Sequence, residues 1–110
     1  MLEQDLIRGH TDGIILSCLT EKDSYGYEIN KTVKAITGGA FEMKEATLYT
    51  AFRRLEDAGW IVSYWGGEAT GARRRYYRIT DPGKCAYRDM VSRWAETRTV
   101  LDQLLKERES

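Results

Sequence analysis

The sequence predicts a mainly α-helical fold with one small β-hairpin. Three segments before Gly59 carry apolar side chains at the three-and-four spacing of amphipathic helices. Two short runs of β-branched and aromatic residues follow, at residues 60–65 and 73–80, with a glycine-rich stretch between them. A fourth helical pattern fills the rest of the chain. At 110 residues the protein is expected to form one compact unit.

The first two helices are expected before residue 40. Residues 2–19 have an apolar side and should form a first helical region with a break near Gly9. A second helix is expected over residues 25–36. Asp23 or Ser24 should be its N-cap, because short side-chain oxygens accept a free backbone N–H at a helix start.

A third helix is predicted over residues 44–58, and it is the element that says most about function. Its apolar side chains fall at i, i+3, i+4 and i+7, the spacing of a buried stripe, at Leu48, Ala51, Phe52 and Leu55. The residues off that stripe are of the types that contact phosphates and base edges from a DNA major groove, namely Thr47, Tyr49, Thr50, Arg53 and Arg54. A polar helix face of this kind can also be no more than a solvated surface. Gly59 suits the left-handed residue that ends a helix.

The hairpin after this helix favours the DNA-binding interpretation. Its second strand begins with Arg73, Arg74 and Arg75, and Arg78 follows. A helix followed at once by a basic hairpin is typical of a winged helix-turn-helix domain, with the helix in the major groove and the hairpin along the DNA backbone. Three adjacent guanidinium groups repel one another, so we expect an anionic partner to neutralise them.

The distribution of charge supports the same interpretation, although the total does not. The chain has 17 basic and 17 acidic residues. Residues 1–43 contain 4 basic and 7 acidic residues, residues 44–78 contain 7 and 4, and residues 79–110 contain 6 of each. The positive charge is concentrated in the expected helix and hairpin. Because the net charge of the chain is near zero, we expect one subunit to bind DNA with moderate affinity and tight binding to require two subunits.

A long final helix is expected from about residue 81 to 106. Thr80 or Asp81 should be its N-cap, with Pro82 in the first turn, where its missing N–H does no harm. This helix could pack on its own subunit or pair with a second copy. We favour a homodimer, which would present two recognition helices to a palindromic site about one DNA turn apart. One stripe carries its large apolar side chains, which are Tyr87, Met90, Val91, Trp94, Leu101, Leu104 and Leu105.

Enzyme, metal and membrane functions find little support in the sequence. There is one histidine, His10, and neither a CxxC pair nor a glycine-rich phosphate loop. No serine has an evident catalytic partner. The apolar runs are far shorter than the roughly 18 residues of a membrane span. We therefore expect a reduced, cytoplasmic protein that is not an enzyme and uses no cofactor or metal.

The chain resembles the PadR-like transcriptional regulators over nearly its whole length. The resemblance rests on Ser-Tyr-Gly-Tyr-Glu-Ile at residues 24–29, Glu-Ala-Thr-Leu-Tyr at 45–49 and Arg-Arg-Arg-Tyr-Tyr-Arg-Ile-Thr at 73–80, in this order and spacing. It implies a winged helix-turn-helix over residues 1–80 and a C-terminal dimerisation helix over 81–110. Many members have proline where this chain has Thr50, so base preference is expected to differ from relatives.

The resemblance implies a homodimeric repressor that leaves its double-stranded operator when a small, planar hydrophobic effector binds. The alternative is a winged-helix adaptor that binds protein or RNA without operator binding. Tyr25 and Tyr49 would contact phosphates, although Tyr25 can simply pack between helices. The expected DNA-binding residues are Tyr25, Lys44, Thr47, Tyr49, Thr50, Arg53, Arg54, Arg73, Arg74 and Arg75. The expected effector pocket or dimer interface contains Leu6, Met90, Trp94 and Leu101, and Trp94 could equally be ordinary interface core.

Overall fold

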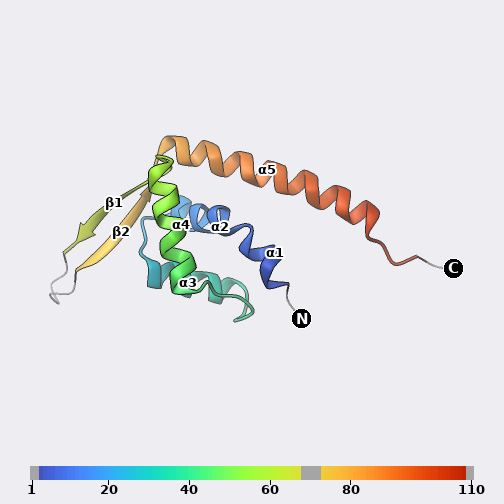
Figure 1. Ribbon diagram of the computed structural model, residues 1–110, viewed down its shortest axis with the longest axis horizontal. Helices are drawn as coiled ribbons and strands as arrows, with labels where there is room; N and C mark the ends of the chain where they lie inside the picture. The colour runs from blue at the N-terminus through green and yellow to red at the C-terminus, as the bar shows by residue number, and fades with distance from the viewer. Residues whose placement is uncertain (1–2, 68–72, 109–110) are drawn as a thin grey trace.

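The computed structural model describes residues 3–67 and 73–108. The elements are α1 (Gln4–Arg8), α2 (Thr11–Glu21), α3 (Gly26–Ile36), α4 (Glu45–Asp57), β1 (Ile61–Gly66), β2 (Arg74–Ile79) and α5 (Asp81–Leu104). Figure 1 shows the antiparallel β1–β2 hairpin beside α4 and the long α5 running across the other helices. This order confirms the predicted fold class. Much of the expected glycine-rich loop, residues 68–72, lies outside the described residues.

The N-terminal helical region is interrupted where the sequence predicted. The N–H of Gly9 bonds to the carbonyl of Asp5, and the N–H of His10 bonds to that of Ile7. These bonds end α1, and α2 then starts at Thr11. The apolar side of α2 enters the core of the protein.

The predicted N-cap of α3 was wrong. Tyr25 occupies the cap position, and its side chain makes no capping bond. The backbone of Ser24 instead pairs with Tyr77 of β2 in an isolated bridge, and its hydroxyl donates to Glu28 at 2.6 Å. Asp23 accepts a hydrogen bond from Tyr64 of β1. Pairing with the hairpin holds this segment away from the geometry that capping requires.

The turns around the hairpin follow the sequence closely. Gly59 has a φ of +77°, the left-handed conformation expected after α4. The strand register pairs Ile61 with Ile79 next to the core. Thr80 caps α5 by accepting the N–H of Gly83 at 3.1 Å, and Pro82 lies in the first turn.

One core joins α2, α3, α4 and the base of the hairpin. Its largest fully buried side chains are Phe52, Ile15, Leu16, Ile29, Leu55 and Ile61. The ring of Phe52 stacks on that of Tyr77 at 3.9 Å between centroids, which ties α4 to β2. The radius of gyration is 16.3 Å, whereas a compact chain of this length would have about 13 Å. The excess reflects the distal part of α5, which extends away from the core (Figure 1).

Candidate DNA-binding surface

Helix α4 presents two opposite faces, as its sequence predicted. Leu48, Ala51, Phe52 and Leu55 are all buried. At 100° per residue, Thr50 and Arg53 lie on the opposite side, and both are exposed. Tyr49 is on the flank nearer the hairpin, while Thr47 and Arg54 are on the other flank. The centre of the exposed face is therefore formed by Thr50 and Arg53.

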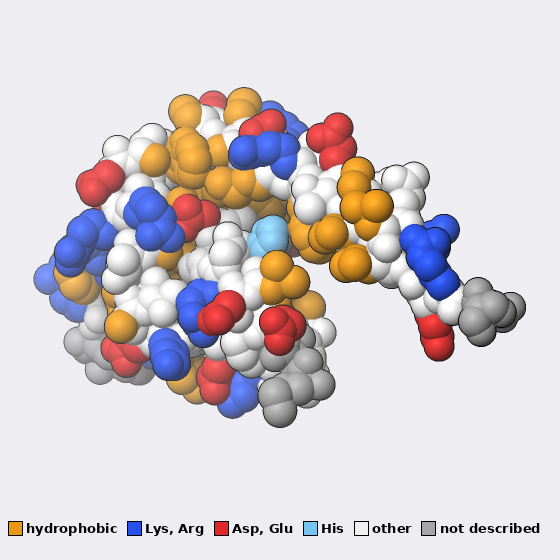
Figure 2. Space-filling model, turned by 45° about the vertical axis from the view of Figure 1, so that its right-hand side comes forward, with side chains coloured by type: hydrophobic (Ala, Val, Ile, Leu, Met, Phe, Trp, Pro, Cys, Tyr) orange, Lys and Arg blue, Asp and Glu red, His pale blue; other side chains and the backbone are white. Residues whose placement is uncertain are grey.

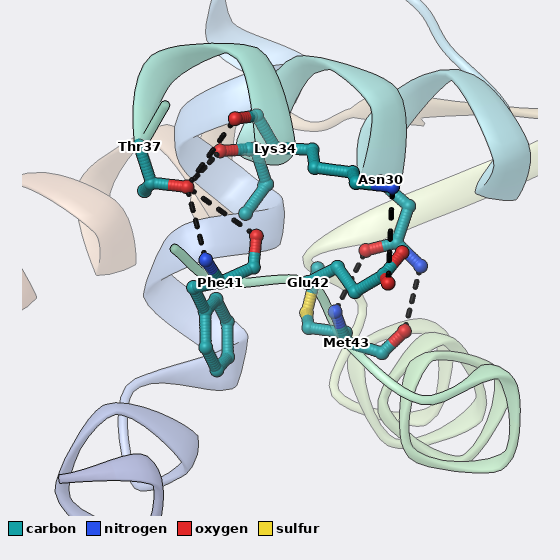
Figure 3. Close-up of polar contacts among 7 residues, drawn as sticks. Asn30, Lys34, Thr37, Phe41, Glu42 and Met43 are labelled. Atoms are coloured by element: carbon teal, nitrogen blue, oxygen red, sulfur yellow. Dashed lines mark hydrogen bonds and ion pairs between the residues drawn. The ribbon is translucent and has the colours of Figure 1, made fainter. Parts of the chain in front are cut away.

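The link into α4 is fixed by Asn30 of α3, a residue that the sequence analysis did not single out. The side-chain amide of Asn30 donates to the carbonyl of Met43 at 2.6 Å, and its oxygen accepts the N–H of Met43 at 2.8 Å (Figure 3). The side chain of Met43 is buried. Nearby, the hydroxyl of Thr37 accepts the N–H of Phe41 at 3.2 Å. These bonds set where α4 begins, and exposed Lys44 follows as its N-cap.

A glycine gives the Tyr49 side chain its room. A Cβ on Gly26 would lie 3.1 Å from the hydroxyl oxygen of Tyr49 and 3.3 Å from a methyl carbon of Leu48. The Tyr49 ring also contacts Phe52 edge-on, with 5.6 Å between centroids. The side chain is 48% exposed, so the hydroxyl is near the surface while the ring is supported from two sides. The Tyr-Gly-Tyr motif contained this signal, because only glycine permits so close an approach of α3 and α4.

The consecutive arginines of the hairpin do not form one cluster. Each guanidinium lies over a different aromatic ring: Arg73 over Trp65 at 5.3 Å, Arg74 over Tyr25 at 4.9 Å, and Arg75 over Tyr77 at 5.9 Å. Alternation along β2 puts Arg74 and Arg75 on opposite faces of the hairpin. The mutual repulsion that the sequence suggested is therefore relieved in part by separation, and cation–π contacts orient each group.

Tyr25 lies where α3 begins and meets the hairpin. Its ring contacts Tyr76 edge-on at 5.3 Å, and Arg74 covers it. It is partly exposed. Both expectations for Tyr25 are compatible with this position, since it packs on the hairpin and still reaches the surface that carries Arg74.

Three of the arginines on and around this surface form ion pairs with carboxylates. Arg54 contacts Asp12 of α2 through two nitrogens, with Nε 3.2 Å from Oδ2. This hydrogen bond raises the pKa of Arg54. The second pair joins Arg75 to Glu56 at 3.4 Å, and the third joins Arg78 to Asp23 at 3.1 Å. Within residues 3–67 and 73–108, no comparable ion pair involves Arg53, Arg73 or Arg74.

The stripe on α5 divides into a packed half and an exposed half. Tyr87 and Met90 pack against the core of their own subunit, and the Tyr87 hydroxyl bonds to Ser17 of α2 at 3.1 Å. Farther along, large apolar side chains are exposed, as Figure 2 shows for the hollowed side where α5 leaves the core. The exposed fractions are 37% for Trp94 and Leu101 and 63% for Leu104.

Leu6 and Trp94 both leave apolar surface exposed. Leu6 of α1 is 59% exposed. The ring of His10, which precedes α2, contacts Trp94 edge-on at 4.9 Å. The first half of α5 thus covers the subunit's own core, whereas the second half has exposed apolar surface, and pairing with a second copy stays a prediction.

Comparison with known proteins identifies the class. The sequence matches the transcriptional regulator PadR-like family over residues 15–89. A transcriptional regulator from Clostridium thermocellum has 47% sequence identity and a TM-score of 0.88, covering 96% of this chain and 100% of the other. A PadR family transcription regulator from Clostridium difficile has 36% identity and a TM-score of 0.76, covering 88% and 99%.

A third structure shows a relative on DNA. It is Bacillus subtilis PadR in complex with operator DNA, with 26% identity, a TM-score of 0.65, and coverage of 73% of this chain and 45% of that one. The present chain belongs to the PadR-like family of transcriptional regulators. This assignment confirms the expected fold and the expectation that the protein is not an enzyme.

None of the helices in the described part of the chain combines the length and apolarity that crossing a bilayer requires. Among those same residues, no group of three or more His, Cys, Asp or Glu side chains is arranged to hold a metal ion.

Proposed function

We propose that this protein is a homodimeric repressor that binds a palindromic operator in double-stranded DNA. In this proposal residues 1–80 bind DNA and residues 81–110 pair the subunits. The observation that carries it is the exposed face of Thr50 and Arg53 on α4, next to a hairpin whose Arg73 and Arg74 are also exposed. Thr and Arg are suited to base edges and phosphates in the major groove.

The position of the hairpin supports a second set of contacts. β1–β2 lies beside α4 and extends past it (Figure 1). With α4 in the major groove, Arg73 and Arg74 would lie along the adjacent phosphate backbone. Tyr25 and Tyr49 would add hydroxyl contacts to phosphates from the start of α3 and from α4. The operator-bound relative from Bacillus subtilis supports this use of the fold.

The apolar end of α5 supports the homodimer. Leu101 and Leu104 lie beyond the part of α5 that packs on the core, and burial of a leucine stabilises by about 1.5–3 kcal/mol when complete. A second α5 would cover these side chains. Two-fold symmetry would then duplicate α4 and the hairpin, so that the dimer would present two basic surfaces although its net charge stays zero.

An effector site is proposed at the hollow near Trp94. Leu6 and Leu101 offer exposed apolar surface, and Trp94 offers an indole ring on which a planar hydrophobic compound could stack. Binding there would act on α5, the element that sets the distance between the two α4 helices in a dimer. Release from the operator would follow from that change of spacing. As a chromosomal regulator the protein would act in the cytoplasm.

The experiment is a fluorescence-anisotropy titration against a duplex from the region upstream of its own gene. If Arg53, Arg73 and Arg74 of both subunits each neutralise a phosphate, log Kobs should fall with log salt with a slope of about −5. An adaptor that binds protein or RNA would show little affinity for the duplex at low salt. If unlabelled DNA of unrelated sequence at equal concentration displaced the labelled duplex, this result would argue against operator recognition.

A further inference from the structure

Arg53 and Arg54 are neighbours in sequence but differ in their surroundings. Arg53 lines a surface hollow between α4 and the hairpin, together with Tyr49, Arg75 and the carboxylates of Glu56 and Asp57. Arg54 points toward α2, where both oxygens of Asp12 accept its N–H groups. One helical step of 100° thus separates a guanidinium without an ion pair, that of Arg53, from one bonded to a carboxylate, that of Arg54.

The Asp12–Arg54 contact joins two helices that the sequence separates by 42 residues. α2 belongs to the core and α4 is the proposed recognition helix, so the contact acts between the scaffold and the DNA-facing element. A two-pronged carboxylate–guanidinium contact also fixes direction as well as distance, because both groups are planar. Such a pair can set the rotation of α4 about its axis relative to α2.

The hairpin is attached to α4 in a similar way. The Ser63 hydroxyl of β1 donates to Glu56 at 2.9 Å, and Arg75 of β2 donates to the same hydroxyl at 2.9 Å. The Arg75 guanidinium is 3.4 Å from Glu56. One carboxylate on α4 therefore contacts both strands, and Arg75 is engaged within the protein.

A guanidinium that is already paired with a carboxylate, as in Arg54, binds phosphate poorly. Its charge is already compensated by the carboxylate, so it recruits fewer of the counter-ions whose release drives binding to DNA. A phosphate that approached Arg54 would also approach Asp12 and be repelled by it. Glu56 and Asp57 line the same hollow as Arg53, but among the described residues no carboxylate lies at ion-pair distance from the Arg53 guanidinium, and Glu56 is paired with Arg75.

We propose that Arg54 is a positioning residue that Asp12 holds in order to set α4 against α2, and that Arg53 makes the DNA contact. This inference rests on the proposed DNA-binding function. Asp12 has a second effect in this arrangement: it keeps one guanidinium per subunit from attracting DNA of any sequence. Because the rotation of α4 determines which base edges Arg53 can reach, operator preference depends on an acidic residue outside the recognition helix.

The test compares two adjacent substitutions with the same chemistry, Arg53→Gln and Arg54→Gln. Binding to a mixed-sequence duplex of roughly 25 base pairs is measured from about 50 to about 200 mM salt. Arg53→Gln should make the salt slope shallower by about 2 for a dimer. Across this salt range, the factor by which its affinity falls should therefore be about ten times smaller than the factor for the wild type. Arg54→Gln should lower affinity by the same factor at every salt concentration and leave the slope unchanged.

Asp12→Asn gives a readout that a merely structural role would not produce. It leaves the Arg54 guanidinium without its carboxylate, so mixed-sequence DNA should bind more tightly and the slope should steepen by about 2. The double variant Asp12→Asn/Arg54→Gln should return to the wild-type slope. A loss of stability alone would weaken binding and could not generate this gain.

The outcomes separate the inference from the function on which it rests. If the wild type binds no duplex at low salt, the proposed function and the inference both fall. If the wild type binds and Arg54→Gln flattens the slope as much as Arg53→Gln, only the inference is overturned. An unchanged slope and affinity in Asp12→Asn would also overturn it.

Discussion

Replacing Gly83 by alanine should destabilise the protein, although alanine is ordinarily the better helix former. Gly83 is in the first turn of α5, where that helix crosses the turn between α4 and β1. A Cβ built there would lie 2.1 Å from the carbonyl oxygen of Trp60 and 2.8 Å from a side-chain carbon of Ile79. Ordinary contact is 3.4–4 Å, so α5 or the turn would have to move by more than 1 Å.

The magnitude follows from two opposing effects. Overpacking typically destabilises by about 1–3 kcal/mol, and the upper end applies here because the obstacle is backbone that also accepts the N–H of Thr80. Removing a helical glycine returns about 0.5–1 kcal/mol. The net loss is about 2 kcal/mol, which lowers the melting temperature of a domain of this size by about 8 °C.

Gly13 of α2 provides the matched control. It is also a helical glycine, but a Cβ there would lie 3.6 Å from the Met90 sulfur, which is ordinary contact. Gly13→Ala should therefore leave stability unchanged or raise it by about 0.5–1 kcal/mol. Both variants are compared by thermal unfolding at one protein concentration, because the melting temperature of a dimer depends on concentration. A Gly83→Ala protein as stable as Gly13→Ala would refute the reasoning.

Three further predictions concern the dimer, the link into α4 and a partly buried thiol. Leu101→Glu should place charge in the proposed α5 interface and give a monomer by sedimentation equilibrium. Asn30→Ala should leave both backbone groups of Met43 unpaired and lower the free energy of unfolding by about 2–3 kcal/mol in urea. Burial raises the pKa of Cys18 above 9.0, so iodoacetamide should modify exposed Cys85 first. The stability that neutral Cys18 contributes is present below about pH 9 and is lost as pH rises above it.

Each of these has its own control. Ile36→Glu changes an equally apolar but highly exposed position on α3 and should leave the assembly state unaltered. Asn30→Asp keeps an acceptor for the Met43 N–H but turns a second acceptor oxygen toward the Met43 carbonyl, so it should recover little of the stability that Asn30→Ala loses. Urea should remove the difference in alkylation rate between the two cysteines. A dimer in Leu101→Glu, wild-type stability in Asn30→Asp, or faster modification of Cys18 would each contradict the corresponding argument.

Local patterns in the sequence were sufficient to predict the elements. The stripe of α4 needs only 3.6-residue periodicity, and the start of α5 needs only Thr80 and Pro82 at their usual places. The residues that position the candidate DNA-binding surface could not be predicted in this way. Asp12 and Arg54 are 42 residues apart, and Arg78 and Asp23 are 55 apart. No periodic pattern specifies which carboxylate will lie beside which guanidinium.

The wrong N-cap has the same origin. Asp23 and Ser24 both have side chains that favour capping, and local preference alone would select one of them. The hairpin determined the outcome instead, because Ser24 pairs with Tyr77 and Asp23 accepts the Tyr64 hydroxyl. A long-range contact thus overrode a local preference worth about 1 kcal/mol.

The zero net charge of the chain can be explained by dividing the arginines into those paired with carboxylates and those left open to a DNA partner. Exposed ion pairs contribute little stability, typically below about 1 kcal/mol, so stability alone gives a weak reason for the carboxylates of Asp12, Asp23 and Glu56 beside a DNA-facing surface. In the proposed function, each of them would lower the attraction for DNA in general and fix an element that carries the open basic side chains. A regulator must distinguish one site from a large excess of others, and a loss of attraction that is equal for all sequences leaves the ratio of specific to non-specific binding unchanged. These carboxylates would therefore improve the selection of one site through geometry, by fixing α4 and the hairpin so that Thr50 and Arg53 contact one sequence better than others.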